Sequence, residues 1–330
     1  MNELMEQITA TAIAHPNIAL IKYWGNLDDE WNIPANSSLS MTLGELSTQV
    51  RLIADEQLDR DLLVMDGYTA PPGAQERVSQ FLDQMRRLSG KGFFCRIESR
   101  SNFPRGSGIA SSAAAFAALA LASAKVFGLS TDPQELSRLA RLGSGSACRS
   151  IFGGFVEWIG GQDHQSSYAV PIAPPQHWNL VDCVAVISTT HKAVSSREGH
   201  RLAKTSPLQI CRVQSAPQRL ETCRHAILER DFEQLARVVE LDSNLMHSVM
   251  MTSCPPLFYW KAETLVVMEN VRQWRTQGEA VCYTIDAGPN VHVLTLSDHA
   301  EQVKEKLIQI DGVQEVIVAP AGDGAIFVEG

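Results

Sequence analysis

The segment PRGSGIASSAAAF, at residues 104–116, carries residue types that can bind a phosphate through the backbone. Gly106 and Gly108 can adopt backbone conformations that other residues avoid, and Ser111 and Ser112 begin a stretch of strong helix formers. The first turn of a helix offers unpaired N–H groups and the positive end of the helix dipole, and both favour an anion. The segment therefore predicts either a phosphate-binding loop or a glycine turn with a serine cap. It matches neither the Walker A pattern nor the dinucleotide fingerprint.

Two further segments combine charged and small residues in ways that suit catalysis. GSGSACRS, at residues 143–150, places three hydroxyls beside Arg149, and a guanidinium binds a carboxylate or a phosphate through two hydrogen bonds at once. Asp286 follows the apolar run YTI and precedes a Gly-Pro turn, where it could act as a base or orient a hydroxyl. The alternatives are a surface arginine in a turn and an aspartate that stabilises its own turn.

Two basic segments could bind an anion. Lys22 and Tyr23 lie in the apolar segment IALIKYWGN, and a lysine in such surroundings needs an anion or a route to solvent. KAVSSREG, at residues 192–199, contains Ser196 and Arg197 and suggests an anion clamp. The alternatives are a lysine whose ammonium reaches solvent and a solvated loop.

Composition excludes several other classes. The net charge of −9 argues against a broad nucleic-acid or anionic-membrane surface. Nine scattered histidines form no metal-ligand spacing, and no nucleophile elbow lies between a strand and a helix. Seven cysteines without a C-x-x-C pair, and an N-terminus without a basic signal-peptide region, favour reduced thiols and a cytoplasmic location. We therefore expect neither nucleic acid nor membrane as a partner.

The elements that must position these residues mix strands and helices without regular alternation, which favours an α+β fold. Residues 8–24 predict a strand, a turn, and then a strand or short helix. Further strands are expected over residues 39–43, 48–53, 62–65, 93–99, 155–159, 183–188, 281–286, 292–296, 314–318 and 325–328. Helices are expected over residues 75–89, 111–127, 133–142, 207–230, 231–247, 256–278 and 299–309, and residues 143–150 predict a helix or turn. A domain boundary is expected between residues 170 and 185, near the segment PIAPPQHW.

Five segments together resemble one family. AHPNIALIKYWGN, IPANSSLSMTL, NFPRGSGIASSAAAFAAL, RLGSGSACRSIFGGFVEW and YTIDAGPNVHVL are similar, in this order and spacing, to diphosphomevalonate decarboxylases, which belong to the GHMP kinase superfamily. The resemblance implies a two-lobed α+β fold with the active site between the lobes. Residues 1–180 would form a ribosomal-protein-S5-like, ATP-binding N-terminal lobe, and residues 181–330 a C-terminal lobe of helices on an antiparallel sheet. Many members are homodimers, so a homodimer is a further expectation.

The resemblance also implies a reaction in isoprenoid biosynthesis, with ATP and Mg²⁺ as cosubstrate and cofactor. ATP phosphorylates the C3 hydroxyl of a 5-phosphorylated mevalonate, and loss of phosphate and CO₂ then leaves an alkene. The matching catalytic residues are Asp286 at the C3 hydroxyl, Arg149 at the substrate carboxylate, and Lys22 near the reacting groups. The matching substrate-binding residues are Ser144 and Ser146 beside Arg149, and Tyr23, Ser196 and Arg197 at the 5-phosphate end. The matching ATP-binding residues are Pro104, Gly106, Ser107, Gly108, Ile109, Ala110, Ser111 and Ser112.

One position departs from the family pattern. Tyr-Trp-Gly-Lys is usual, whereas this chain has Asn26 in place of the lysine that helps to bind the substrate diphosphate. A missing ammonium weakens diphosphate binding most, which predicts mevalonate 5-phosphate as the substrate and isopentenyl phosphate as the product. The alternative is the diphosphate substrate, with Lys192 or Arg197 compensating. Remoter alternatives are a mevalonate 3-kinase that does not decarboxylate and a non-catalytic nucleotide-binding protein.

Overall fold

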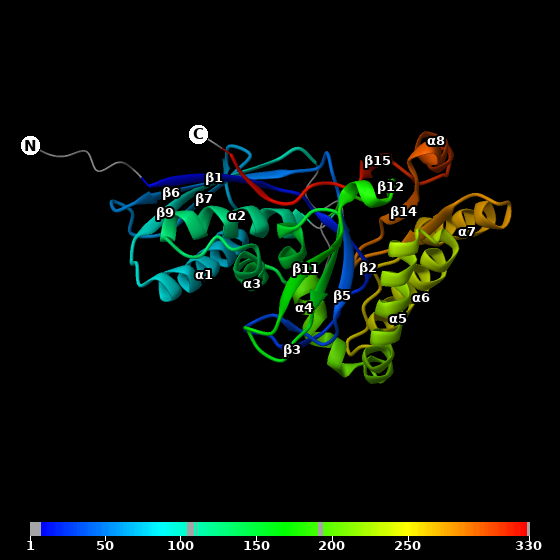
Figure 1. Ribbon diagram of the computed structural model, residues 1–330, viewed down its shortest axis with the longest axis horizontal. Coiled ribbons are helices and arrows are strands. Elements are labelled where there is room, and N and C mark those ends of the chain that lie inside the picture. Colours follow the sequence, from blue (N-terminus) through cyan, green and yellow to red (C-terminus); the bar gives the residue numbers. More distant parts are fainter. Residues whose placement is uncertain (1–7, 104–108, 110, 191–193, 329–330) are drawn as a thin grey trace, which may run out of the picture.

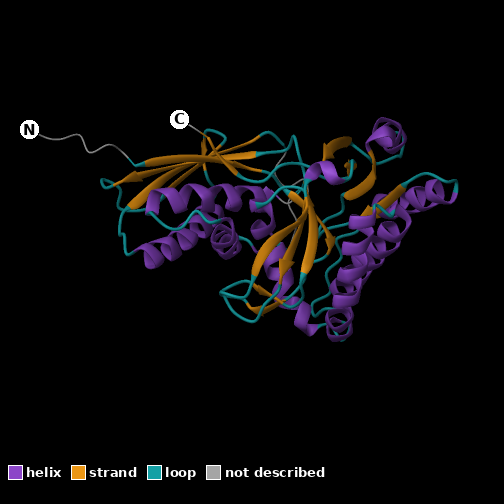
Figure 2. Ribbon diagram, in the orientation of Figure 1, coloured by secondary structure: helices purple, strands orange, loops and turns teal. Residues whose placement is uncertain are grey.

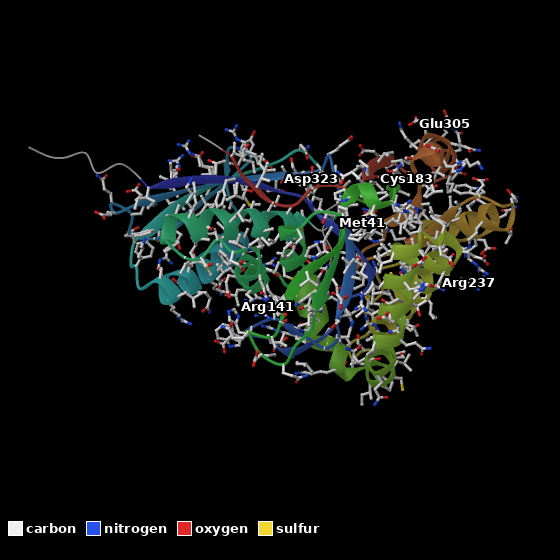
Figure 3. All side chains as sticks on the ribbon, viewed as in Figure 1. Met41, Arg141, Cys183, Arg237, Glu305 and Asp323 are labelled. Atoms are coloured by element: carbon white, nitrogen blue, oxygen red, sulfur yellow. The ribbon has the colours of Figure 1, made fainter. Side chains whose placement is uncertain are left out.

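The computed structural model describes residues 8–103, 109, 111–190 and 194–328. The chain forms two lobes (Figure 1), and strands and helices contribute to both of them (Figure 2). Met41 and Cys183 are buried, whereas Arg237 and Glu305 are exposed on helices of the second lobe (Figure 3). The expected α+β class is therefore confirmed.

The first lobe is built on a six-stranded sheet with the order β16-β1-β6-β9-β7-β8. The strands are β1 (Thr9–Ala14), β6 (Thr48–Asp55), β7 (Leu62–Met65), β8 (Tyr68–Thr69), β9 (Phe94–Ser101) and β16 (Ile326–Val328). Helices α1 (Pro72–Ser89), α2 (Ser111–Phe127) and α3 (Pro133–Gly143) cover one face of this sheet (Figure 1). Strand β16 comes from the end of the chain and pairs antiparallel with β1, so the C-terminal segment returns to the first sheet.

Helix α2 lies at the centre of this lobe because alanine dominates its sequence. Nearly every residue from Ala113 onward is buried, and the small side chains let the helix pack closely against β1 and β6. Strand β6 alternates buried Val50 and Leu52 with an exposed Arg51, which turns one face of the strand to the core. Burial of α2 fixes the position of its first turn, where Ser111 lies.

A second sheet, with the order β11-β10-β5-β2, joins the two lobes. Its strands are β2 (Asn17–Ile21), β5 (Ser38–Thr42), β10 (Phe155–Ile159) and β11 (Tyr168–Ala173). Strands β2 and β5 are completely buried and share a core with helices α5 (Gln209–Glu229) and α6 (Phe232–Met251). A short pair, β3 (Asn26–Asp28) and β4 (Ile33–Pro34), follows β2.

The third sheet belongs to the second lobe and is entirely antiparallel, with the order β13-β14-β12-β15. Its strands are β12 (Leu180–Val186), β13 (Val281–Thr284), β14 (Val291–Leu296) and β15 (Glu315–Pro320). In β12, Val181 and Cys183 face a core shared with α7 (Ala262–Thr276) and α8 (Ala300–Ile308), whereas Leu180 and Val184 face the core shared with α5 and α6. Burial on both faces explains why β12 is apolar except for Asp182, whose Oδ2 lies 2.6 Å from the Nδ1 of His292 on β14.

The structure differs from the sequence prediction in a few elements. The helix expected over residues 256–278 begins only at Ala262, where Lys261 is the N-cap and its N–H donates to the Thr264 hydroxyl at 3.0 Å. Strand β11 was not predicted and overlaps the expected domain boundary, and helix α4 (Ser196–Leu202) lies where a solvated loop was one alternative. The second half of residues 8–24 is strand β2, and residues 145–151 form the short 3-10 helix η1 (Gly145–Ile151). No described helix is long and apolar enough to cross a membrane.

Candidate active site

A cavity of about 650 Å³ lies where the two lobes and the second sheet meet. It is lined by residues that follow β2, by one face of α1, by the first turn of α2, by η1 and by α4. Asp286 and Ala287, which follow β13, complete the wall. The cavity is thus assembled from segments that are separated by most of the chain length.

Every described residue that the sequence assigned to the site lines this cavity. They are Lys22, Tyr23, Asn26, Ile109, Ser111, Ser112, Ser144, Ser146, Arg149, Ser196, Arg197 and Asp286. Pro104, Gly106, Ser107, Gly108 and Ala110 lie outside the described residues. The structure therefore brings together the segments that sequence analysis treated separately.

An ion pair between Lys22 and Asp286 lies in the cavity wall. The Lys22 Nζ is 2.5 Å from the Asp286 Oδ1, and the side chain of Lys22 is 1% exposed, whereas that of Asp286 is 28% exposed. Burial lowers the pKa of Lys22, and the charge of Asp286 opposes this shift. The carboxylate therefore lies at the boundary between a buried cation and the open cavity, where it can contact a bound hydroxyl.

Buried groups of the second lobe hold the backbone of Lys22 in place. Asp242 of α6 accepts a hydrogen bond from the Lys22 N–H at 2.6 Å, and Arg212 of α5 donates to the Lys22 carbonyl at 2.7 Å. Asp242 also pairs with Arg219 of α5 at 2.6 Å. All three of these charged side chains are buried. The end of β2 is therefore anchored to α5 and α6, and these anchors were not predicted from sequence.

Arg149 is a buried cation whose hydrogen bonds go to neutral oxygens. It is 2% exposed, and it donates to the Oδ1 of Asn17 at 3.0 and 3.2 Å and to the Oγ of Ser38 at 2.7 Å. None of the ion pairs within the described parts of the chain involves Arg149. Burial lowers the pKa of this guanidinium, and a buried cation without an anionic partner favours a bound anion. Arg149 is thus suited to a substrate carboxylate.

A second arginine faces Arg197 in the cavity and was missed by the sequence analysis. Arg77, on α1, donates to the carbonyl of Gly143 at 2.9 Å and lies over the ring of Phe116. Burial lowers the pKa of Arg77 to about 10, and the charge of Arg197 is the next cause. Two guanidinium groups that repel each other across a cavity favour an anion between them. In the sequence, Arg77 has no local signal, because it resembles any polar residue of an amphipathic helix.

Asn26 lines the cavity, but its amide is engaged within the protein. The Tyr23 hydroxyl donates to the Oδ1 of Asn26 at 2.5 Å, and the Nδ2 of Asn26 donates to Asp29 at 2.8 Å. The Tyr23 ring lies so close to Gly145 that a Cβ there would be 2.7 Å away. Tyr23 and Asn26 therefore form a fixed part of the wall.

Serine hydroxyls connect the first turn of α2 to the end of α3. The Oγ of Ser112 lies 3.3 Å from the Oγ of Ser144, and Ser111 lines the cavity beside them. The described residues contain no group of three or more His, Cys, Asp or Glu side chains that could hold a metal ion.

The structure is that of a two-lobed α+β protein whose cavity is lined by Lys22, Arg77, Arg149 and Arg197. Residues 14–169 match the diphosphomevalonate decarboxylase-like N-terminal domain, and residues 183–320 match the mevalonate 5-diphosphate decarboxylase C-terminal domain. The chain belongs to the diphosphomevalonate decarboxylase family. The resemblance found in the sequence is therefore confirmed, as are the expected two-lobed GHMP-kinase-like fold and the carboxy-lyase class.

Relatives and solved structures agree with this assignment. The chain is 39% identical to the diphosphomevalonate decarboxylase of Candida albicans over 314 residues, which cover 90% of this chain and 86% of that protein. It is 38% identical to the human enzyme, with 87% of this chain and 77% of that protein covered. The mevalonate diphosphate decarboxylase structure from Staphylococcus aureus gives a TM-score of 0.93 at 36% identity and covers 99% of both chains. The structure from Enterococcus faecalis gives 0.92 at 35% identity and covers 98% of this chain and 100% of that chain.

Proposed function

We propose that this protein catalyses the ATP-dependent decarboxylation of mevalonate 5-diphosphate to isopentenyl diphosphate. The observation that carries the proposal is that one cavity holds the Lys22–Asp286 pair, the buried Arg149, and the cations Arg77 and Arg197. Support comes from the Enterococcus faecalis relative, for which a mevalonate diphosphate mediated ATP binding mechanism is described. A structure in complex with MVAPP, AMPPCP and magnesium, at a TM-score of 0.92 and 35% identity, adds to this support.

The preference for mevalonate 5-phosphate that Asn26 predicted is not supported. The relatives described above are diphosphate enzymes, and the comparisons favour the diphosphate alternative. The cavity also supplies a physical reason, because Arg77 adds a cation that the sequence analysis did not weigh. Together with Arg197 it can offset the lysine missing at position 26. Lys192, the other expected substitute, lies outside the described residues.

In this proposal the first step is phosphorylation of the tertiary C3 hydroxyl. When bound, ATP with Mg²⁺ supplies the phosphoryl group that converts this hydroxyl into a leaving group and neutralises charge on the phosphates. Asp286 orients the hydroxyl and accepts its proton. The buried Lys22 keeps Asp286 in position, because the two side chains are already in contact.

The second step is loss of phosphate and CO₂. Arg149 binds the substrate carboxylate and sets its orientation relative to C3, while Ser144 and Ser146 line the cavity beside it. The electrons of the breaking C–C bond form the alkene as phosphate leaves from C3, so no external oxidant is needed. The presence of Arg149 together with Asp286 favours this reaction over the kinase alternative, which has no need of a carboxylate ligand.

The described residues fit a nucleotide with Mg²⁺. Mg²⁺ bound chiefly by nucleotide phosphates and water needs one or two protein oxygens, and Ser111, Ser112 and Asp286 bring oxygen atoms to the cavity. Helix α2, which begins at Ser111, directs its first N–H groups to the same region.

We further propose a lobe boundary near residue 180. The two family matches, at residues 14–169 and 183–320, support it, although β16 belongs to the first sheet. A homodimer and a cytoplasmic location remain predictions.

The test is a coupled ADP-release assay that compares mevalonate 5-diphosphate with mevalonate 5-phosphate, with CO₂ measured in parallel. We expect a higher kcat/KM for the diphosphate and one CO₂ for each ADP. A higher kcat/KM for the monophosphate would overturn the substrate assignment, and ADP release without CO₂ would instead identify a kinase.

A further inference from the structure

His200 lies in the cavity wall and has no role in the mechanism above. It belongs to α4, the same short helix that brings Ser196 and Arg197 to the cavity. Gly199 lets this helix pack directly on Trp24, because a Cβ at that position would collide with the indole ring. His200 is therefore held beside the segment that follows β2.

The imidazole of His200 is fixed by its neighbours. Its ring is stacked on Tyr23 with centroids 4.0 Å apart and lies 4.6 Å from the centroid of Trp24. The backbone N–H of Gly25 donates to the Nδ1 of His200 at 3.0 Å. Three consecutive residues thus determine both the position and the rotation of the ring.

The Gly25 contact also determines where the ring carries its proton. Because Nδ1 accepts a hydrogen bond, the neutral ring carries its proton on Nε2. Burial, followed by the charge of Arg212, lowers the pKa of His200 to about 3, so the ring stays neutral near pH 7. Among the described residues, none accepts a hydrogen bond from Nε2. His200 lines the cavity, and Nε2–H is the single donor of its neutral ring.

We infer that His200 is a substrate-binding residue whose Nε2–H donates to the 5-phosphate end of the substrate. The inference rests on the proposed function and on the family resemblance, which assigns Tyr23, Ser196 and Arg197 to that end of the substrate. Arg197 and Arg77 supply charge there, whereas the amide of Asn26 is engaged by Tyr23 and Asp29. A neutral donor of fixed direction adds selectivity for the substrate, because its hydrogen bond is strongest when a phosphate oxygen lies on the N–H axis.

Two substitutions of His200 test the roles of its two ring nitrogens separately. His200→Asn keeps an acceptor near the position of Nδ1 and removes the Nε2 donor. His200→Gln places an amide donor near the position of Nε2 and removes the acceptor for Gly25. His299→Asn, at an exposed position, is the matched control. For each protein we would measure the Kd of mevalonate 5-diphosphate by calorimetry without nucleotide, and kcat and KM in the ADP-release assay.

Loss of a hydrogen bond to a charged phosphate should raise Kd and KM about tenfold or more in His200→Asn. We expect kcat to fall less than about threefold, because His200 is not placed at the reacting atoms, and we expect His200→Gln to retain most of the affinity. A Kd within twofold of wild type for His200→Asn, or equal losses in both variants, would overturn the inference. If wild type itself fails to turn over the diphosphate, the proposed function fails instead.

A measurement on the wild-type protein covers the case in which His200→Asn does not fold. Nitrogen NMR of histidine-labelled protein reports the tautomer of each ring, and the His200 signals are assigned by their loss in His200→Gln. We expect an Nε2–H tautomer whose resonance shifts when mevalonate 5-diphosphate is added. A proton on Nδ1, or no shift at saturating substrate, would overturn the inference.

Discussion

Replacing Asp286 by asparagine tests the centre of the proposed mechanism. The substitution keeps the size of the side chain and removes its charge beside Lys22, whose Nζ lies 2.5 Å away. Burial already lowers the pKa of Lys22, and the charge and hydrogen bond of Asp286 are the largest opposing influences. Without them the pKa of Lys22 falls further. The variant therefore loses a base from the cavity and the main group that stabilises the charge of Lys22.

The expected loss of activity is large and confined to catalysis. A positioned general base contributes about 10²–10⁴ in rate, so we expect kcat to fall about a thousandfold. KM should change less than about threefold, because Arg77, Arg149 and Arg197 still bind the anionic groups of the substrate.

The folded state should survive the substitution. Breaking a fully buried ion pair costs about 3–5 kcal/mol, but the Asp286 side chain is 28% exposed and Lys22 can become neutral. We therefore expect the free energy of unfolding to fall by about 1–2 kcal/mol. Coupled ADP release, CO₂ release and urea unfolding would be measured together, with the exposed Asp298→Asn as control. A folded Asp286→Asn protein that keeps more than about a tenth of the wild-type kcat would refute the role of Asp286.

Three further predictions concern groups around the cavity. Arg77→Ala should raise KM for mevalonate 5-diphosphate about tenfold or more with little change in kcat, and an unchanged KM in the ADP-release assay would remove Arg77 from the phosphate site. Asp242→Asn should lower kcat and move the alkaline limb of the pH–kcat profile to lower pH, because the charge of Asp242 raises the pKa of Lys22. A variant with lower stability and an unshifted profile would show that Asp242 has a structural role alone. His247 is 1% exposed, and burial lowers its pKa to about 3. Between about pH 3 and 6.5 the unfolded chain therefore binds one more proton than the folded protein, and the folded protein loses stability as the pH falls through that range. Urea unfolding should show that wild type loses about 2 kcal/mol more than His247→Gln between pH 7 and 5, and equal losses would count against this account.

Local patterns in the sequence were sufficient to predict most of the fold. The alternation in β6 and the alanine-rich composition of α2 are periodic signals that survive in the structure, because each element buries one dominant face or its whole surface. Strand β11 was missed because Pro171 and the prolines that follow it resemble a linker. Helix α4 was missed because its seven residues are too few for an apolar period to appear.

The candidate site could be predicted from the sequence only in part. Its motifs could be found in the sequence because glycines, serines and charged residues cluster within short segments. The pairing of Lys22 with Asp286 could not be found, since 264 residues separate the two side chains. Arg212 and Asp242 present the same difficulty, because a charged residue in a helix looks solvated until the structure shows it buried against the end of β2.

The proposed substrate shows how contacts between distant segments affect a prediction of function. Within its own segment, Asn26 is the loss of one lysine charge, and this loss alone favours a monophosphate substrate. In the proposed function, charge at the 5-phosphate end is instead a sum over side chains from separate elements, and it includes Arg77 of α1 and Arg197 of α4. A cation lost from one element can be offset by a cation from another, provided that both face the same anion. The selectivity of the cavity therefore depends on the whole set of donors around it, and His200 belongs to that set as the member that contributes direction without charge.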